Sequence, residues 1–163
     1  MNIKLHILEF MVTPAILLTV SSAWAAESVV TAAMAGHWEG NARIVVSWCH
    51  QTNLPVKIDI HADGNVTGTV GDAQLKKGHF QQNRGWLGRQ LNLATDFIVQ
   101  GNLEGALVAA EGITRERVMM PLNFDEGAFK GGVNTSGKML VTKDQMKEQM
   151  PLSAASLRLT HSQ

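Results

Sequence analysis

The chain has 163 residues, which suits one domain and is short for two. Its 14 basic and 14 acidic residues cancel, which removes the usual electrostatic reason to expect nucleic acid or an anionic membrane as a partner. Hydrophobic residues make up 45% of the chain and charged residues only 17%, a composition that excludes a disordered protein and supplies a sizeable core.

Residues 1–25 predict a secretory signal peptide. Lys4 precedes an apolar run over residues 10–20, and Ala23-Trp24-Ala25 then forms an A-x-A-like cleavage site. The run is shorter than the roughly 20 apolar residues that span a bilayer. We therefore expect an exported protein, periplasmic or secreted, cleaved after Ala25 or Ala26. An uncleaved anchor or a buried N-terminal helix is the alternative.

After the predicted signal peptide, the chain is expected to contain a single folded domain. Residues 26–35 are expected to form a flexible N-terminal segment, and residues 36–163 a single β-barrel domain. After the signal segment no stretch is long and apolar enough to cross a bilayer, so we expect no integral membrane protein after processing.

Four short units recur, each with glycine at both ends and a large apolar residue in the middle. They are Gly36–Gly40, Gly64–Gly68, Gly101–Gly105 and Gly127–Gly131. We expect the first glycine to supply a turn conformation and the apolar residue to begin the inward face of a strand. The second glycine shares that inward face and lets the strand bend or another backbone approach. With Trp38, these glycines form the predicted signature of the fold.

Apolar and polar residues alternate with a period of two through most of the chain after residue 36. Short polar turns such as Asp63-Gly64 join the runs, and Arg115-Glu116-Arg117 is expected to be the exposed part of a hairpin. About eight strands result, so we predict an all-β fold, an antiparallel up-and-down barrel. The predicted inward positions are Trp38, Ala42, Ile44, Val46 and Trp48; Val56, Ile58 and Ile60; Leu91, Leu93, Phe97 and Val99; Val118, Met120, Leu122 and Phe124; and Ala155, Leu157 and Leu159.

One segment has a different period. Thr142 and Gln145 form a capping box, helix-forming residues follow, and Pro151 ends the run. Met146 and Met150 then share one face of the helix. This predicts one short helix laid against the sheet just before the last strand.

Gly36-His37-Trp38 on the first strand, the run of antiparallel strands and the helix before the last strand resemble the lipocalin-like, or calycin, barrels. The glycine-bounded turns also resemble those of small exported bacterial barrel proteins. The resemblance covers Gly36–Thr160. Thr95-Asp96-Phe97 is a near match to the T-D-Y segment of lipocalins, with Phe where Tyr is usual, and the disulfides common in secreted lipocalins are missing. The resemblance implies an interior cup that takes a small apolar molecule.

If such a cup exists, large side chains near its mouth are the candidate ligand contacts. These candidates are Trp48, Trp86, Phe97 and Met120. The alternative for both tryptophans is that they fill the ends of the barrel as core, since large aromatic side chains usually pack. Trp38 is assigned to the barrel floor.

The single cysteine, Cys49, excludes an internal disulfide, so the core must hold the fold. We expect Cys49 to be a small buried side chain near a strand end, and an intermolecular disulfide or a reactive thiol is the alternative.

No residue pattern indicates catalysis. The chain lacks Gly-x-Ser-x-Gly, and its carboxylates alternate onto polar faces, except Glu111, which we expect to be a satisfied carboxylate at the barrel rim. Histidines have no spacing typical of metal ligands. The histidines after the predicted signal segment are His37, His50, His61, His79 and His161. We therefore expect no enzyme, no metal and no cofactor.

Two functions stay open. The first is an exported, non-enzymatic barrel that binds a small apolar ligand in its interior. The second is an envelope interaction protein or inhibitor with a filled barrel, whose loops contact a protein partner. A nucleic acid is not expected, and an outer-membrane barrel ranks low because the chain has no tyrosine for an aromatic girdle. The volume left inside the barrel distinguishes the first two.

Overall fold

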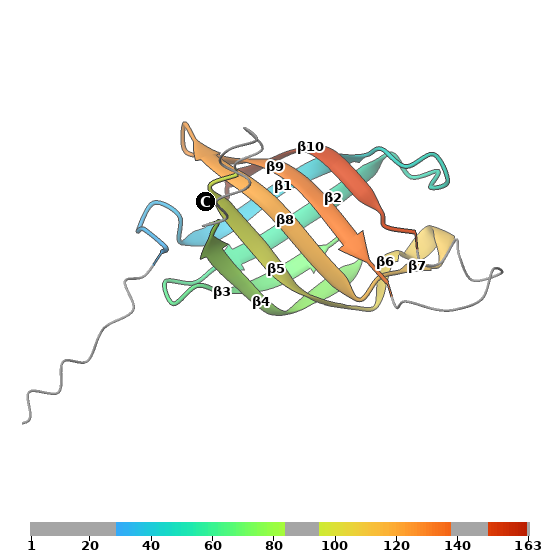
Figure 1. The fold of residues 1–163 in the computed structure, drawn as a ribbon, viewed down its shortest axis with the longest axis horizontal. Coiled ribbons are helices and arrows are strands. Elements are labelled where there is room, and N and C mark those ends of the chain that lie inside the picture. Colours follow the sequence, from blue (N-terminus) through green and yellow to red (C-terminus); the bar gives the residue numbers. More distant parts are fainter. Residues whose placement is uncertain (1–28, 84–94, 138–149, 163) are drawn as a thin grey trace, which may run out of the picture.

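The computed structural model describes residues 29–83, 95–137 and 150–162, which form a closed barrel of eight antiparallel strands (Figure 1). The barrel strands are β1 (Gly36–Ile44), β2 (Asn53–Ile60), β3 (Asn65–Val70), β4 (Ala73–Gln82), β5 (Phe97–Glu104), β8 (Arg117–Asp125), β9 (Ala128–Ser136) and β10 (Ser153–His161). A side hairpin carries β6 (Ala106–Val108), the 3-10 turn η1 (Ala109–Glu111) and β7 (Ile113–Thr114).

Each barrel strand pairs with the next one along the chain, and β1 pairs with β10 to close the ring. The predicted all-β, up-and-down barrel is therefore confirmed, and it is compatible with a lipocalin-like fold. The side hairpin between β5 and β8 was not predicted. The predicted signal peptide over residues 1–25, residues 142–149 of the predicted helix, and Leu91 and Leu93 lie outside the described residues.

Along the strands, residues alternate between inside and outside except at bulges, and the inward side chains fill the barrel. An eight-stranded barrel is only wide enough for its own side chains or for one small ligand. The largest side chains with almost no exposed surface are Trp38, Phe80, Phe129, Leu54, Ile58, Ile60, Leu107, Met120, Leu122, Leu152, Leu157 and Leu159. They form one continuous cluster with the smaller buried residues, so the core occupies the interior of the barrel.

The first end of the barrel, which we call the N-terminal end, is covered by residues 29–35. Val30 and Met34 are buried there against the core. The indole Nε1 of Trp38 donates a hydrogen bond to the carbonyl oxygen of Met34, at 2.9 Å. Trp38 also packs edge-on against Phe129, with ring centroids 4.7 Å apart. The predicted position of Trp38 at the barrel floor is confirmed, and the chain's own N-terminal segment closes that floor.

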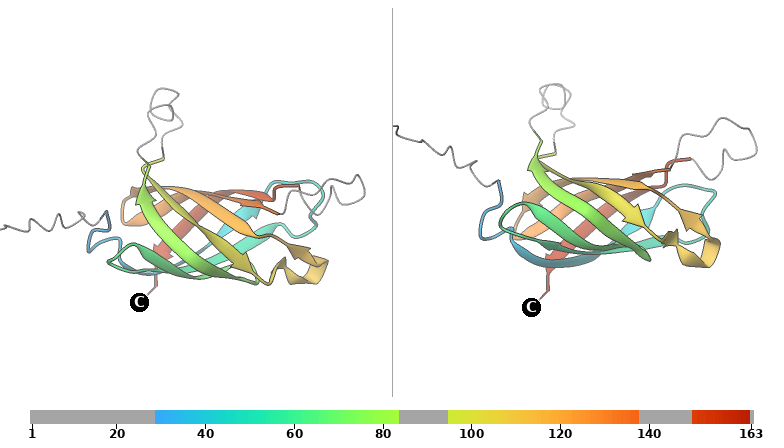
Figure 2. Two further views of the ribbon diagram at one scale, coloured as in Figure 1. Left: turned by 60° about the horizontal axis from the view of Figure 1, so that its bottom comes forward. Right: turned by 90° about the horizontal axis from the view of Figure 1, so that it is seen from below.

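The opposite end, which we call the hairpin end, carries β6, η1 and β7 (Figure 2). Leu107 and Val108 from the hairpin are fully buried, as is Leu152 just before β10. The turn between β3 and β4 holds the hairpin in place. The backbone N–H of Asp72 donates a hydrogen bond to the carbonyl oxygen of Leu107 at 3.1 Å. The side-chain Oδ2 of Asp72 accepts the backbone N–H of Ala109 at 2.8 Å. Apolar side chains therefore cover both ends of the barrel.

The glycine units act largely as predicted. Their middle residues, from Trp38 to Phe129, are all buried. At Gly68, φ is +137° and a Cβ would lie 2.1 Å from the carbonyl oxygen of Lys57, so only glycine allows β2 and β3 to approach there. The third unit reverses the roles, because Gly101 takes the close approach and Gly105 the positive φ of +97°.

Three of the predicted inward positions do not lie on the inward face of a strand, although Val46 and Trp48 still pack partly against the core. The first strand ends at Ile44, so Val46 and Trp48 lie on the loop that follows it instead of on a strand face. Ala155 is exposed and Ala154 is buried. The reason is a bulge in β10, where the register shifts and Ser156 adopts a φ of +56°. One extra residue moves the alternation by one position.

Replacing Gly68 by Ala is expected to lower the free energy of unfolding by about 3 kcal/mol or more, because the new Cβ overlaps backbone and the φ is unfavourable. Gly127→Ala is the control. Gly127 also has a positive φ, of +73°, but no atom lies within 4 Å of its added Cβ, so we expect a loss of about 1–2 kcal/mol. Urea unfolding of both variants measures the difference, and equal losses would contradict the close approach.

Candidate functional site

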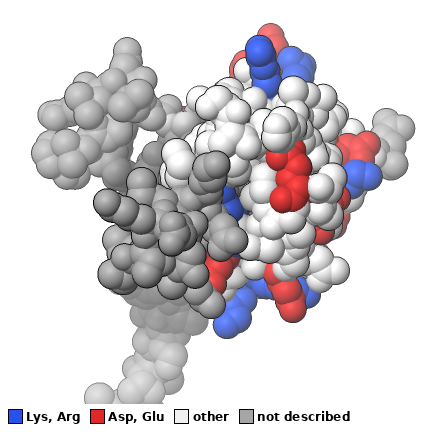
Figure 3. All heavy atoms as spheres, turned by 90° about the vertical axis from the view of Figure 1, so that its right-hand side faces the viewer, with Lys and Arg blue, Asp and Glu red and all other residues white. Residues whose placement is uncertain are grey.

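A pocket of about 450 Å³ opens at the hairpin end. One wall is the loop after β1 and the other is the side hairpin with the residue that follows it. The lining residues are Ser47, Trp48, His50, Glu111, Gly112, Ile113, Thr114 and Arg115. Figure 3 looks onto this end, where the described surface is mostly uncharged, with acidic side chains near its middle and charges of both signs at its edges.

The carboxylate of Glu111 ties the loop after β1 to the side hairpin. It accepts the backbone N–H of Gln51 at 2.6 Å and that of His50 at 3.1 Å. The thiol of Cys49 lies 3.6 Å from Oε1 of the same carboxylate, and Nδ1 of His50 lies 3.3 Å from Oε2. These contacts occupy both carboxylate oxygens. The expectation of a satisfied carboxylate at the barrel rim is therefore confirmed.

Hydrogen bonds favour the ionised form of this carboxylate. The backbone N–H donors of His50 and Gln51 hold the pKa of the Glu111 carboxyl below its ordinary value. A general base at neutral pH instead needs a raised carboxyl pKa and a free oxygen to accept a proton. The geometry of Glu111 suits the fixing of a loop.

Cys49 is buried, as predicted, although it lies in the loop after β1. Its thiol donates to the carbonyl oxygen of Gln51 at 3.5 Å as well as facing Glu111. Burial raises the pKa of the Cys49 thiol, and the neighbouring Glu111 carboxylate acts in the same direction. A thiol with a raised pKa is a weak nucleophile at neutral pH.

Arg115 is buried, with only 3% of its surface exposed, so the prediction that this residue is part of an exposed hairpin is wrong. Its guanidinium donates to the carbonyl oxygen of Thr114 at 2.5 Å and to that of Met150 at 2.6 Å. It also lies over the ring of Trp48, 5.2 Å from the centroid. A guanidinium is planar and has several N–H donors, so it can stack on an aromatic ring while it donates to two carbonyl oxygens. These contacts explain why Arg115 can be buried.

Apolar side chains are exposed at this end of the barrel. Val45 is 58% exposed and Met150 is 44% exposed, and Trp48 is half-buried against the core. The backbone N–H of Val45 donates a hydrogen bond to the carbonyl oxygen of Ser153 at 3.0 Å, which places Val45 beside the start of β10. We call the surface formed by Val45, Trp48 and Met150 next to the buried Arg115 the hairpin-end face.

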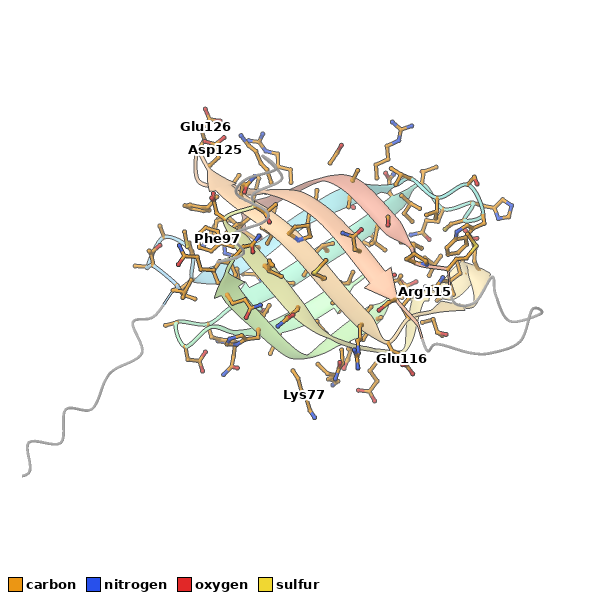
Figure 4. The ribbon with its side chains drawn as sticks, viewed as in Figure 1. Lys77, Phe97, Arg115, Glu116, Asp125 and Glu126 are labelled. Atoms are coloured by element: carbon orange, nitrogen blue, oxygen red, sulfur yellow. The ribbon has the colours of Figure 1, made fainter. Side chains whose placement is uncertain are left out.

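The structure does not bring the predicted ligand contacts together. Trp48 lies at the hairpin end and Met120 is fully buried in the core. Phe97 lies at the N-terminal end, opposite Arg115 in Figure 4, where its ring stacks on Phe80 with centroids 5.0 Å apart. Trp86 lies outside the described residues.

Sequence reasoning missed Arg115. The alternation of charges in residues 115–117 suggests a solvated turn, and no local signal distinguishes the buried arginine from its exposed neighbours. Its aromatic partner Trp48 is far away in sequence, so only the folded chain pairs them.

Within residues 29–83, 95–137 and 150–162, no three His, Cys, Asp or Glu side chains group closely enough to hold a metal ion. None of the helices in those residues has the length and hydropathy needed to span a bilayer. The fold and site define the class of the protein as a closed eight-stranded barrel with covered ends. No protein-family model matches the chain, and neither the curated proteins nor the solved structures contain a match.

The Glu111 contacts predict a pH dependence of stability. A carboxyl whose pKa is lower in the folded state stabilises the fold above its unfolded pKa and loses that effect as pH falls through its folded pKa. In Glu111→Gln the amide cannot take the negative charge. The variant should therefore unfold at lower urea concentration than the parent at about pH 7, with the gap narrowing at about pH 3. A gap that does not change with pH would mean that the charge of Glu111 has no part in holding the loop.

The Cys49 environment predicts slow thiol labelling. In the folded protein Ellman's reagent should modify Cys49 at least about a hundredfold more slowly than in urea, because the thiol is buried and its pKa is raised. The rate in Glu111→Gln is the comparison, since loosening the loop should speed labelling. Rapid labelling of the folded parent protein would contradict the packing described above.

Proposed function

We propose that this chain is an exported, non-catalytic barrel that binds a protein partner through its hairpin-end face. The observation that carries the proposal is the filled interior, in which large side chains such as Trp38, Phe80 and Met120 have almost no exposed surface. A barrel packed in this way presents its outer surface and ends to other molecules. The signal-like N-terminus supports export, and the Gly36-His37-Trp38 start of β1 supports a lipocalin-like relationship.

Binding of an apolar ligand in the interior would require this core to open. Residues such as Phe129, Leu122 and Leu159 would have to leave contacts at which they are fully buried. Deleting or displacing such side chains typically costs about 2–5 kcal/mol each. Both ends are also covered, by Met34 and Trp38 at one and by Leu107 and Leu152 at the other. The packing thus favours the filled-barrel hypothesis over the interior cup.

The composition of the hairpin-end face fits a protein interface. Aromatic residues and Met are enriched at the centres of such interfaces, and hot spots are often Trp. Here Arg115 fixes the ring of Trp48 from behind, so the tryptophan loses little side-chain entropy when a partner contacts it. Val45 and Met150 then supply apolar contact area at its edge.

Site-specific photo-crosslinking in the source cells tests the proposal. A benzophenone amino acid replaces Val45, which is exposed on the hairpin-end face, or Glu126, which is exposed in the turn between β8 and β9 at the other end. We expect a discrete crosslinked protein from position 45 and none from position 126. With that protein purified, Trp48→Ala should weaken binding by at least about tenfold, while Lys57→Ala on the barrel wall leaves it unchanged.

Equal crosslinking from both positions, or a Trp48→Ala variant that binds as well as the parent, would contradict the proposed face.

The interior cup is tested in parallel. Fatty acids and an environment-sensitive apolar dye are titrated against the tryptophan fluorescence of the folded protein. Saturable binding near one equivalent, altered in Met120→Ala, would overturn the filled barrel and favour an apolar carrier.

A further inference from the structure

A second hollow lies on the outside of the barrel wall, and at Pro151 it reaches the chain next to Met150 of the hairpin-end face. It has a volume of about 580 Å³ and crosses β4, β5, β8 and β9. Its main polar lining residues are Lys77, His79, Gln100, Asn102, Arg117 and Asn134. We call this hollow the wall groove. Its volume falls within the range of pockets that bind small molecules.

Strand register arranges the polar side chains of the groove in rows. His79 pairs with Gln100, Gln100 with Met119, and Met119 with Asn134. Residues that pair directly across antiparallel strands have their Cβ atoms about 5 Å apart and on the same face. Three of these four side chains are polar and Met119 is 45% exposed, so the row forms a continuous band across four strands. Asn102, paired with Arg117, runs beside it.

The groove carries positive charge. Lys77 and Arg117 line it, and none of the described lining residues is Asp or Glu. The neighbouring Lys76 pairs with Glu104 at 3.5 Å. In the part of the chain that the structure describes, neither Lys77 nor Arg117 takes part in an ion pair. Two cations that make no ion pair with the described residues favour an anionic ligand.

The backbone is distorted at the point where Lys77 stands. Alternation from the buried Leu75 would place residue 77 inside the barrel, but a bulge in β4 leaves both Lys76 and Lys77 exposed on the outside. Lys77 takes a φ of +51°, a conformation that glycine adopts without strain and that other residues adopt at a cost of about 1–2 kcal/mol. Lys77 projects outward from the wall (Figure 4). Backbone strain at an exposed side chain is a reason to test that position for a function.

The neutral groups narrow the ligand class. The amides of Gln100, Asn102 and Asn134 each donate and accept hydrogen bonds, which matches hydroxyl groups. Met119 offers an apolar surface to the face of a ring. We propose that the wall groove binds an anionic saccharide, such as a sugar phosphate or a uronic acid, with Lys77 and Arg117 on the acid group and the amides on the hydroxyls.

Titration calorimetry and amide NMR shifts of the purified protein test this proposal. The probes are glucose 6-phosphate and glucuronate, with glucose, inorganic phosphate and a short polyglutamate peptide as comparisons. We expect both acidic sugars to bind more tightly than glucose and phosphate, and more weakly as salt rises. The NMR shifts should concentrate on β4, β5, β8 and β9.

Lys77→Gly and Arg117→Gln should each weaken acidic-sugar binding by about tenfold. Lys77→Gly also removes the backbone strain, so its thermal midpoint should not fall, which separates lost binding from misfolding. Lys76→Gln removes a neighbouring charge that is already paired with Glu104 and should bind within about twofold of the parent. Binding of phosphate equal to that of glucose 6-phosphate, preference for the peptide, or unchanged affinity in Lys77→Gly would each overturn the proposal.

Discussion

Closing eight strands into one small ring is the constraint on which the other features of this protein depend. In a barrel of this strand number the inward side chains meet at the axis, so they must be large enough to fill it and the backbone must coil tightly around them. Trp38 and Phe129 supply the volume near the N-terminal end. Gly68 and Gly131 allow neighbouring backbones to approach where a Cβ would overlap a carbonyl oxygen.

Because side chains fill the interior, a binding partner would have to contact the outer surface or the ends of the barrel. The ends are covered by the chain's own apolar groups, Met34 at one and Leu107 at the other. At the hairpin end, the polar groups of Glu111 and Arg115 meet donors and acceptors that lie far away in the sequence, which fixes the loop after β1 against the side hairpin. A loop fixed in this way presents Trp48 in one orientation, and pre-organised side chains bind at lower entropic cost.

The bulges that allow the strands to close into a barrel also determine which side chains lie on its outer wall. Bulges at Lys77 and Ser156 let the strands coil, and each bulge also places two consecutive side chains outside the barrel. At Lys77 this adds a cation to a groove that holds no described carboxylate. The geometry that closes the barrel therefore also shapes its outer surface. The proposed end-face contact and the wall groove are lined by different residues, which come next to each other at Met150 and Pro151.

The sequence by itself determined the class of fold and most of the core. Period-two alternation decides which face of a strand is apolar, so the pattern alone places Trp38, Ile58, Met120 and Leu159 inside the barrel, where they are buried. The tertiary structure alone decided the rest. The bulge at Ser156 reverses the alternation at Ala155, and the register of pairing, which depends on the whole barrel, sets that shift. Arg115 is buried because Trp48 and Met150, from distant segments, meet it in space, and local sequence carries no record of such long-range contacts.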